Sequence, residues 1–271
     1  MLSGAKHLGS TPSEAGKTTE ILRPLRMTTE CWTVSGCYSL GFGALMTQLP
    51  FEQFPTLSAI GICRHVFTQR IPGIDVSHDK AKVLERLDAA HCEIRNAIGI
   101  GDWPLFTAEQ IHGNNIAVID SCSRGPVGRE FPACDGIITN QRGVALGIYV
   151  ADCCAVYIVD PKTPAIGLVH SGRKGTELGV VTNAIRQMIE RFGSDPADTI
   201  VQLSPCIRPP HYEVDFAAEV IWQCRLLGVQ EIHDSGICTA CDLNRYYSYR
   251  AEKGKTGRML ALIGFHPTIA N

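Results

Sequence analysis

The segment AVYIVDPKTPAIGLVH (residues 155–170) contains two apolar runs joined by a short turn that carries two prolines. Apolar runs of this length are typical of strands, and a short turn between them favours a hairpin or two adjacent strands of one sheet. Strand-like pieces continue on both sides of it, VALGIYV (144–150) before and TIVQLSP (199–205) after. The segment therefore predicts a sheet in this part of the chain.

Helical periodicity appears in three other segments. Residues 80–98 repeat apolar side chains on one helical face, and residues 176–192 and 214–227 predict two more helices that Gly193 and Gly228 would end. The face of the first helix is expected to consist of Ala81, Leu84, Leu87, Ala90, Ile94 and Ile98. Other strand-like pieces are HVFTQ (65–69), LFTAEQIHG (105–113), NIAVID (115–120) and CDGIITN (134–140). Because several strand pairs lack an intervening helix, the order favours an α+β (mixed α/β) fold, with mixed sheets flanked by helices.

Composition excludes some classes of function. The formal net charge of the 271 residues is −2, so there is no basic surplus to neutralise a phosphate backbone, and no nucleic-acid partner is expected. No apolar run approaches the ~20 residues of a membrane helix, so no membrane partner is expected either. Twelve cysteines in a long chain without a secretory signal indicate free thiols in a reducing cytoplasm. A monomer and a homodimer are both compatible with the sequence.

Residues 1–50 differ in composition from the rest of the chain. The first twenty residues are rich in Gly, Ser, Thr and Lys, with little apolar content, so a partly disordered N-terminal extension is expected there. From about residue 51 the pattern becomes globular, which predicts one domain over residues 51–271.

Three segments share one form, in which an apolar strand runs into a residue that can bind metal. They are QIHG (110–113), VADCC (150–154) and LVHSG (168–172). Two imidazoles and one thiolate suit Zn²⁺, and three protein ligands leave a fourth position free, as in catalytic zinc sites. The candidate ligands are His112, Cys153 and His170. Their wide spacing is unlike that of a zinc finger, so each histidine by itself is better explained as a partly buried structural residue than as a ligand.

Further motifs give these segments a context. They are HVFTQR (65–70), ADCCAVYIVD (151–160), GLVHSGRKG (167–175), SPCIRPPHYEVD (204–215) and CTACDLNRYYSYRAEKGKTGR (238–258). Together with QIHG, and in this order, they resemble the laccase-domain or multicopper polyphenol oxidase family, also described as purine nucleoside phosphorylases of the peptidoglycan-editing-factor type. The resemblance covers about residues 51–266. It implies a fold similar to that of the cytotoxic necrotizing factors.

The resemblance also implies an activity. Members of this family hold zinc on His, Cys and His, which correspond to His112, Cys153 and His170. They act on adenosine, inosine, guanosine and methylthioadenosine, which they cleave with phosphate, and they deaminate adenosine. The expected partners are therefore a small-molecule nucleoside and phosphate. The laccase label suggests copper, but a single His/Cys/His group does not resemble a multicopper site, so copper ranks second to zinc.

The chain departs from the family pattern beside the third ligand. The family usually has Trp-Arg after His-Ala-Gly, whereas this chain has Arg173-Lys174 after Ser171-Gly172. A base-stacking surface would be lost there and an anion-binding role gained. Arg173 and Lys174 at a helix start suit phosphate, although a plain tight turn explains them equally well. Gln110 and Ser248 are the other predicted substrate-binding residues.

Two residues are assigned catalytic roles and two cysteines are not. Asp152 could orient a histidine ligand or act as a general base, or could be only a hydrogen-bond acceptor at a strand end. Arg250 could pair with phosphate or form a structural salt bridge. Cys238 and Cys241 form a CxxC, but no second pair exists, so packing thiols are the favoured interpretation.

Two other hypotheses use the same residues. In a hydrolase similar to the cytotoxic necrotizing factor deamidases, Cys153 would be the nucleophile and His170 its base. In a non-enzymatic peptidoglycan-editing or binding protein, the metal would be structural.

Overall fold

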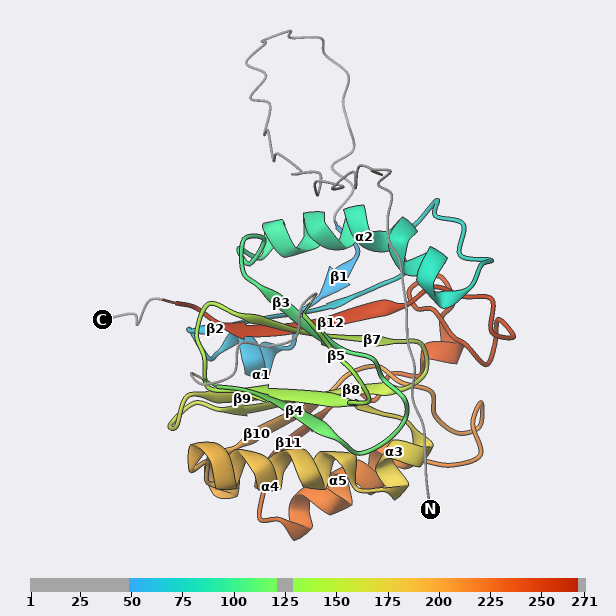
Figure 1. Cartoon of the computed structure of the whole chain (residues 1–271). Helices are drawn as coiled ribbons and strands as arrows, with labels where there is room; N and C mark the ends of the chain where they lie inside the picture. Colours follow the sequence, from blue (N-terminus) through green and yellow to red (C-terminus); the bar gives the residue numbers. More distant parts are fainter. Residues whose placement is uncertain (1–48, 121–128, 268–271) are drawn as a thin grey trace, which may run out of the picture. The chain divides into compact units, whose positions relative to one another are not determined.

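The computed structural model describes residues 49–120 and 129–267, which form two six-stranded mixed sheets lying face to face (Figure 1). Sheet A has the order β1 (Phe51–Glu52), β2 (Cys63–Thr68), β12 (Met259–Phe265), β7 (Ala145–Val150), β3 (Leu105–Ala108) and β5 (Glu130–Phe131). Sheet B has the order β11 (Glu231–Asp234), β10 (Ile200–Leu203), β8 (Cys154–Asp160), β9 (Ala165–Ser171), β6 (Gly136–Thr139) and β4 (Ile116–Ile119). The expected mixed sheets are confirmed.

Helices cover the outer faces of both sheets (Figure 1). The outer side of sheet A carries α2 (Lys80–Ala97), and that of sheet B carries α3 (Arg173–Glu177), α4 (Val180–Phe192) and α5 (Phe216–Leu226). The short elements are α1 (Pro55–Ser58), η1 (Pro196–Asp198) and η2 (Thr239–Cys241). No helix in residues 49–120 and 129–267 is long and apolar enough to cross a membrane. Apart from its last two residues, the predicted extension 1–50 lies outside the described residues, and the boundary near residue 51 stays a prediction.

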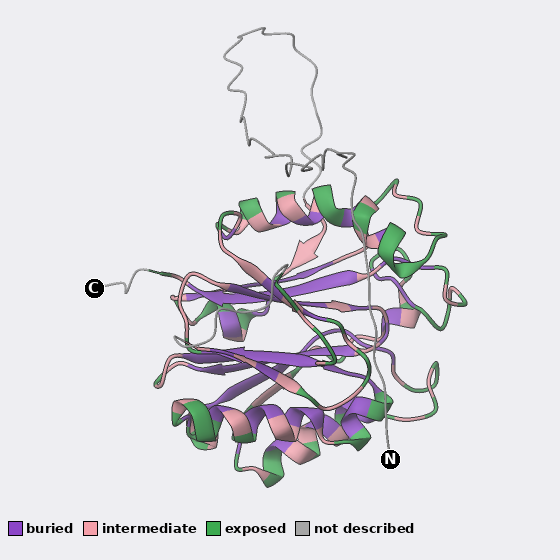
Figure 2. Cartoon of the chain, viewed as in Figure 1, coloured by how far each residue is buried: buried purple, intermediate pink, exposed green. Residues whose placement is uncertain are grey.

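Strand β8 is buried on both faces (Figure 2). Alternate side chains of a strand point to opposite faces. Ala155, Tyr157 and Val159 belong to the cluster that includes the core of sheet A, and Cys154 and Val156 pack with α4 and α5. This double burial explains why its sequence is a continuous apolar run. The predicted hairpin is confirmed, because β8 pairs antiparallel with β9.

The helix predicted over residues 176–192 is two helices. α3 ends at Glu177 and α4 begins at Val180, and between them Gly179 has a φ of 70°. This left-handed conformation is easy only for glycine, and it interrupts the helical path. The first of the two helices, α3, begins at Arg173, three residues after the predicted ligand His170.

The face of α2 also differs from its expected composition. Val83 and His91 are buried, with Leu87 and Ile94, whereas Ala81 is exposed. The buried face of α2 is therefore rotated from the expected one, and it includes His91, which a search for apolar side chains leaves out. Among the described residues, the Nε2 of His91 has no hydrogen-bond partner.

We expect His91 to make the protein sensitive to acid. Burial lowers the pKa of His91 to about 4. An unfolded chain has a histidine pKa of about 6.5, so it binds a proton that the folded chain does not take up until about pH 4. The stability is therefore fully present above about pH 6.5 and is lost as the pH falls towards about 4, by about 3 kcal/mol. Urea unfolding at pH 7 and pH 4.5 should show a smaller loss for His91→Leu than for the wild type.

The exposed His78, replaced in the same way, is the control, because its ring lies at the surface. An acid-induced loss of stability that is equal in the wild type and in His91→Leu would contradict this account.

Candidate metal centre

Three connections between the sheets meet at one edge of the molecule. Strands β7, β3 and β5 are parallel neighbours in sheet A, so their carboxyl ends lie together. Each is followed along the chain by a strand of sheet B, namely β8, β4 and β6. The connections carry Cys153, His112 and Asp135 in the same order. His170 comes from β9, which pairs with both β8 and β6. Strand order therefore gathers four residues that are far apart in the sequence.

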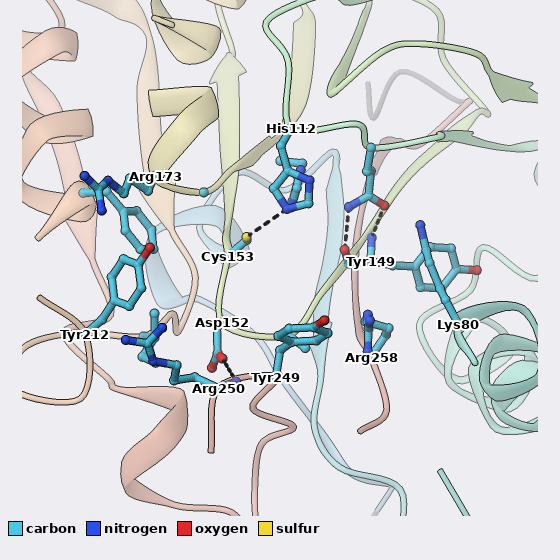
Figure 3. A pocket seen from close by; sticks show the side chains of 16 residues that line it. Lys80, His112, Tyr149, Asp152, Cys153, Arg173, Tyr212, Tyr249, Arg250 and Arg258 are labelled. Carbon is cyan, nitrogen blue, oxygen red and sulfur yellow. Dashed lines mark hydrogen bonds between the residues drawn. The ribbon is translucent and has the colours of Figure 1, made fainter. Parts of the chain in front are cut away.

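The three predicted ligands lie together in one group (Figure 3). Their ligand atoms are all within 4.8 Å of one another. The Sγ of Cys153 is 3.9 Å from Nε2 of His112, and the ring centroids of His112 and His170 are 4.7 Å apart. A tetrahedral zinc ion with Zn–S of about 2.3 Å and Zn–N of about 2.0–2.1 Å would hold S and N about 3.6 Å apart. The distance between Cys153 Sγ and His112 Nε2 is a few tenths of an ångström longer than this value.

Asp135 positions the two histidines. One oxygen of its fully buried carboxylate lies 2.9 Å from Nδ1 of His170 and also accepts the backbone N–H of His112 at 2.8 Å. The other oxygen accepts the N–H of Gly113 at 2.6 Å. Fixing Nδ1 leaves Nε2 of His170 free to bind a metal, which is the usual role of a carboxylate behind a histidine ligand. The same bonds hold His112 at a φ of 61°.

The charges of the group support one another. Burial alone would raise the pKa of Cys153, but the charge of His170 and hydrogen bonds from His112 and His170 outweigh it and lower that pKa to about 6. Burial would lower the pKa of His170, but Cys153 and Asp135 raise it to about 9. Burial opposes ionisation of Asp135 as well, and its hydrogen bonds lower its pKa. A thiolate, the form in which cysteine binds metals, is thus favoured near neutral pH.

Gly172 leaves room for the sulfur. A Cβ built on this glycine would lie 2.6 Å from Sγ of Cys153, a distance that real side chains do not adopt. Any larger residue would displace the thiolate. The glycine of the His-Ser-Gly motif is therefore a steric requirement of the metal group.

The metal group opens into a cavity of about 480 Å³. This is within the usual range for small-molecule sites. One wall carries Lys80, Tyr149 and Arg258, and the other carries Arg173 and Tyr212 (Figure 3). The rest of the lining includes Asp152, Tyr249 and Arg250.

The predicted cations do not all face the cavity freely. Arg173 lines it, but its guanidinium pairs with Glu177 at 2.9 Å and Glu213 at 3.4 Å. Arg250 also lines it and pairs with Glu213 at 3.2 Å. Lys174 is exposed and is not part of the cavity wall. The charges of Arg173 and Arg250 are therefore largely balanced by acids at the rim.

The predicted polar residues are mostly committed to the protein itself. The amide of Gln110 donates to the carbonyl of Tyr149 and accepts its N–H at 2.9 Å. Ser248 is fully buried, accepts the N–H of Ala251 and does not line the cavity. Its predicted contact with substrate does not fit this position.

Asp152 lies at the cavity wall, next to the candidate ligand Cys153. Its two carboxylate oxygens accept the hydroxyl of Thr239 and the N–H of Arg250, each at 2.7 Å. Its backbone has a φ of 83°. These bonds fit a residue that holds the connection in shape, and the general-base role stays a prediction.

Several cavity residues were not among the predicted ones. Within residues 49–120 and 129–267, neither Lys80 nor Arg258 forms an ion pair with a carboxylate. The ammonium group of Lys80 donates to the carbonyl of Glu109 at 3.3 Å, and Arg258 donates to that of Gly257 at 2.8 Å. Burial lowers the pKa of both groups, and the charge of Arg258 further lowers that of Lys80. This wall is a place where an anion would be favoured.

The chain belongs to the multi-copper polyphenol oxidoreductase laccase family, whose sequence model matches residues 56–224 and 214–266. It is similar to the purine nucleoside phosphorylase YlmD of Bacillus subtilis, 30% identical over 192 residues, 58% of this chain and 69% of that protein. It is also similar to the purine nucleoside phosphorylase Cgl2154/cg2365 of Corynebacterium glutamicum, 29% identical over 240 residues, 79% of this chain and 94% of that protein.

Solved structures show the same fold. YlmD from Geobacillus stearothermophilus superimposes with a TM-score of 0.70 at 23% identity, covering 80% of this chain and 98% of that one. The hypothetical protein YfiH of Bacillus licheniformis gives 0.69 at 21% identity, covering 81% and 98%. The predicted fold class and family are both confirmed.

Proposed function

We propose that this protein is a zinc-dependent purine nucleoside phosphorylase that also deaminates adenosine. The observation that carries the proposal is a His/Cys/His group at one end of a cavity whose walls hold cations and aromatic rings. The names of its relatives support the substrate class. Two imidazoles and one thiolate suit zinc, and they do not provide the many histidines of a multicopper oxidase. We therefore rank zinc above copper.

The residues of the metal group divide the work. His112, Cys153 and His170 would hold Zn²⁺, which when bound supplies Lewis-acid polarisation of the attacking oxygen. With Asp135 on Nδ1 of His170 at 2.9 Å, Nε2 of that ring would be the atom that holds the ion. Asp152 keeps the connection beside Cys153 in place through Thr239.

Phosphate is proposed to bind at Lys80 and Arg258. Both are cavity residues without a carboxylate partner in the described chain, whereas Arg173 and Arg250 are balanced by Glu213. An anion gains most where positive charge is partly buried and not already paired. This moves the anion site away from Arg173 and Lys174, where the sequence had suggested it.

The purine is proposed to stack on Tyr249. Tyr249 lines the cavity and is 55% exposed, so a ligand in the cavity can reach it. The guanidinium of Arg258 lies over this ring, 5.8 Å from its centre, so the proposed phosphate and base positions are near each other. An aromatic ring at this position would replace the surface that the family's tryptophan supplies.

Product analysis tests the proposal. Zinc-loaded protein given adenosine and phosphate should break the bond between the purine and C1′ of the ribose and join phosphate to C1′, giving adenine and ribose-1-phosphate. Without phosphate it should give inosine and ammonia. Replacing Arg258 with Met should raise the KM for phosphate by about 10-fold, as expected when one charged hydrogen-bond donor is lost, and should leave inosine formation nearly unchanged.

Arg64→Met, on the far strand β2 and outside the cavity lining, is the matched control. Protein with zinc on the three ligands that forms none of these products would contradict the proposal. An equal loss of both reactions in Arg258→Met would reject the assigned phosphate position alone.

A Cys–His hydrolase is the second candidate. Cys153, His170 and Asp135 form an array in which a carboxylate orients a histidine that lies beside a thiol. Activity of metal-free protein that thiol alkylation abolishes would favour this candidate. Activity that chelation alone removes would oppose it.

A further inference from the structure

We propose that the chain carries a second metal site, made of His211, Cys238 and Cys241, that binds Zn²⁺. These residues take no part in the first metal group and do not line its cavity. Their ligand atoms all lie within 4.8 Å of one another. The interpretation of both cysteines as packing thiols is wrong for Cys241, whose side chain is exposed.

The distances within the group fit a zinc ion. Nδ1 of His211 lies 3.7 Å from Sγ of Cys238 and 3.5 Å from Sγ of Cys241. Tetrahedral zinc with ordinary bond lengths keeps a sulfur and a nitrogen ligand about 3.6 Å apart. Both separations are close to that value, and closer than the 3.9 Å between Cys153 and His112 in the first site.

The two cysteines are held on one side of a tight turn. They are three residues apart, and η2 (Thr239–Cys241) follows directly after Cys238. In a 3₁₀ turn, side chains three residues apart lie above one another. The N–H of Cys241 donates to the carbonyl of Cys238 at 3.1 Å, which closes the turn. The turn therefore holds the two sulfurs on one side.

The histidine and the cysteines lie on segments that are tied to each other. The backbones of Cys206 and Cys238 pair in an isolated parallel β-bridge, and both thiols are free. The N–H of Thr239 donates to the carbonyl of Cys206 at 3.2 Å. The N–H of His211 donates to the carbonyl of Arg208 at 2.9 Å, and Arg208 forms an ion pair with Asp234. Ordering the ligands in advance lowers the entropy that metal binding must overcome.

The ligand set selects the class of ion. Two thiolates and one imidazole are soft or borderline donors, which favour Zn²⁺ over Mg²⁺ or Ca²⁺. His211 is exposed, so water can complete a fourth position. This open position differs from that of the first site, since it does not face the cavity.

The segments of the second site are hydrogen-bonded to Asp152, which lines the cavity of the first site. Ile207 donates its N–H to the carbonyl of Asp152 at 2.8 Å, and Thr239 donates its hydroxyl to the Asp152 carboxylate at 2.7 Å. These two residues belong to the segments that a metal on His211, Cys238 and Cys241 would join. The role of the second ion is therefore to stiffen the support of the connection that carries Cys153.

Zinc stoichiometry tests the proposal. Reduced protein, equilibrated with zinc and freed of excess, should contain two ions per chain by elemental analysis. The Cys238→Ser/Cys241→Ser variant and the Cys153→Ser variant should each contain one. Cys92→Ser, on α2 and in neither group, should keep two. With Co²⁺ in place of zinc, the thiolate charge-transfer absorption lost in the double variant should be about twice that lost in Cys153→Ser, because two sulfurs are removed instead of one.

The exposed His211 gives a milder variant. If the double variant fails to fold, His211→Ala takes its place in the test, and it should lose the ion of the second site. A wild type with one ion, or a double variant and His211→Ala that both keep two, would overturn the proposal. So would a wild type whose Cys238 and Cys241 form a disulfide after metal loading. None of these outcomes depends on purine turnover.

Discussion

Replacing Cys153 with serine is expected to remove the first metal ion and to lower kcat/KM for adenosine phosphorolysis by about 10³-fold or more. Cys153 is the only sulfur of that ligand group, and a serine hydroxyl at this position is a poor ligand for zinc. A Lewis-acid metal supplies several kcal/mol of transition-state stabilisation, and each 1.4 kcal/mol is about tenfold in rate. Zinc content and initial rates, measured on the same preparation, check both parts.

The neighbouring cysteine provides a matched control. Cys154 is fully buried and packs towards α4 and α5, on the opposite face of β8. Its sulfur lies near the carbonyls of Ala155 and Ser204, which a serine hydroxyl can also reach. Cys154→Ser should keep both zinc and activity. Turnover retained in a Cys153→Ser protein without zinc at this group would disprove the role of the metal.

Replacing Asp135 with asparagine is expected to weaken zinc binding at the first site by about 10–100-fold, the usual cost of losing a carboxylate behind a histidine ligand. The amide loses the charge that favours the histidine tautomer and one of the acceptors that hold His112 and Gly113. The zinc dissociation constant, measured by competition with a chelator of known affinity, reports the change. Activity at saturating zinc should recover in part.

Asp160 gives a control for the general effect of losing a buried acid. It too is fully buried, and it accepts the N–H groups of Lys162 and Thr163 in the turn between β8 and β9. Asp160→Asn should lower the free energy of unfolding and leave zinc affinity unchanged. If both variants lose stability and neither loses zinc affinity, Asp135 has only a structural role.

The strands could be predicted where burial gives a local signal. Strands β8 and β9 are continuous apolar runs, so their positions and their hairpin follow from the sequence. The central strand β12 (Met259–Phe265) was not predicted, although MLALIGF is as apolar as they are. The local signal for this strand was therefore present, and only its place between β2 and β7 depends on pairing between distant segments that no local pattern reveals.

The candidate metal ligands could be proposed from the sequence, whereas the residues that support them could not. Three ligand motifs in a known order suggested His112, Cys153 and His170, but Asp135 reaches them only because β6 lies beside β9. The single hint was an acid placed directly before a buried strand. Arg173 and Glu177 form an ordinary i,i+4 pair, but the predicted helix began at residue 176, so this pair was missed.

The second metal group shows a different limit. The CxxC was set aside because no second cysteine pair exists. The third member of the group is His211, about 30 residues earlier in the sequence. Its segment is joined to the segment of the two cysteines by the backbone β-bridge between Cys206 and Cys238. Only the folded chain reveals that proximity.

Zinc withdrawal and return, followed on one sample, tests the central claim most directly. The Cys238→Ser/Cys241→Ser variant is the protein to use, so that zinc content reports the first site alone. We predict that adenosine phosphorolysis falls in proportion to zinc as a chelator removes it, and returns in proportion as zinc is restored. Full turnover by the zinc-free protein, abolished only by alkylation of its thiols, would contradict the account.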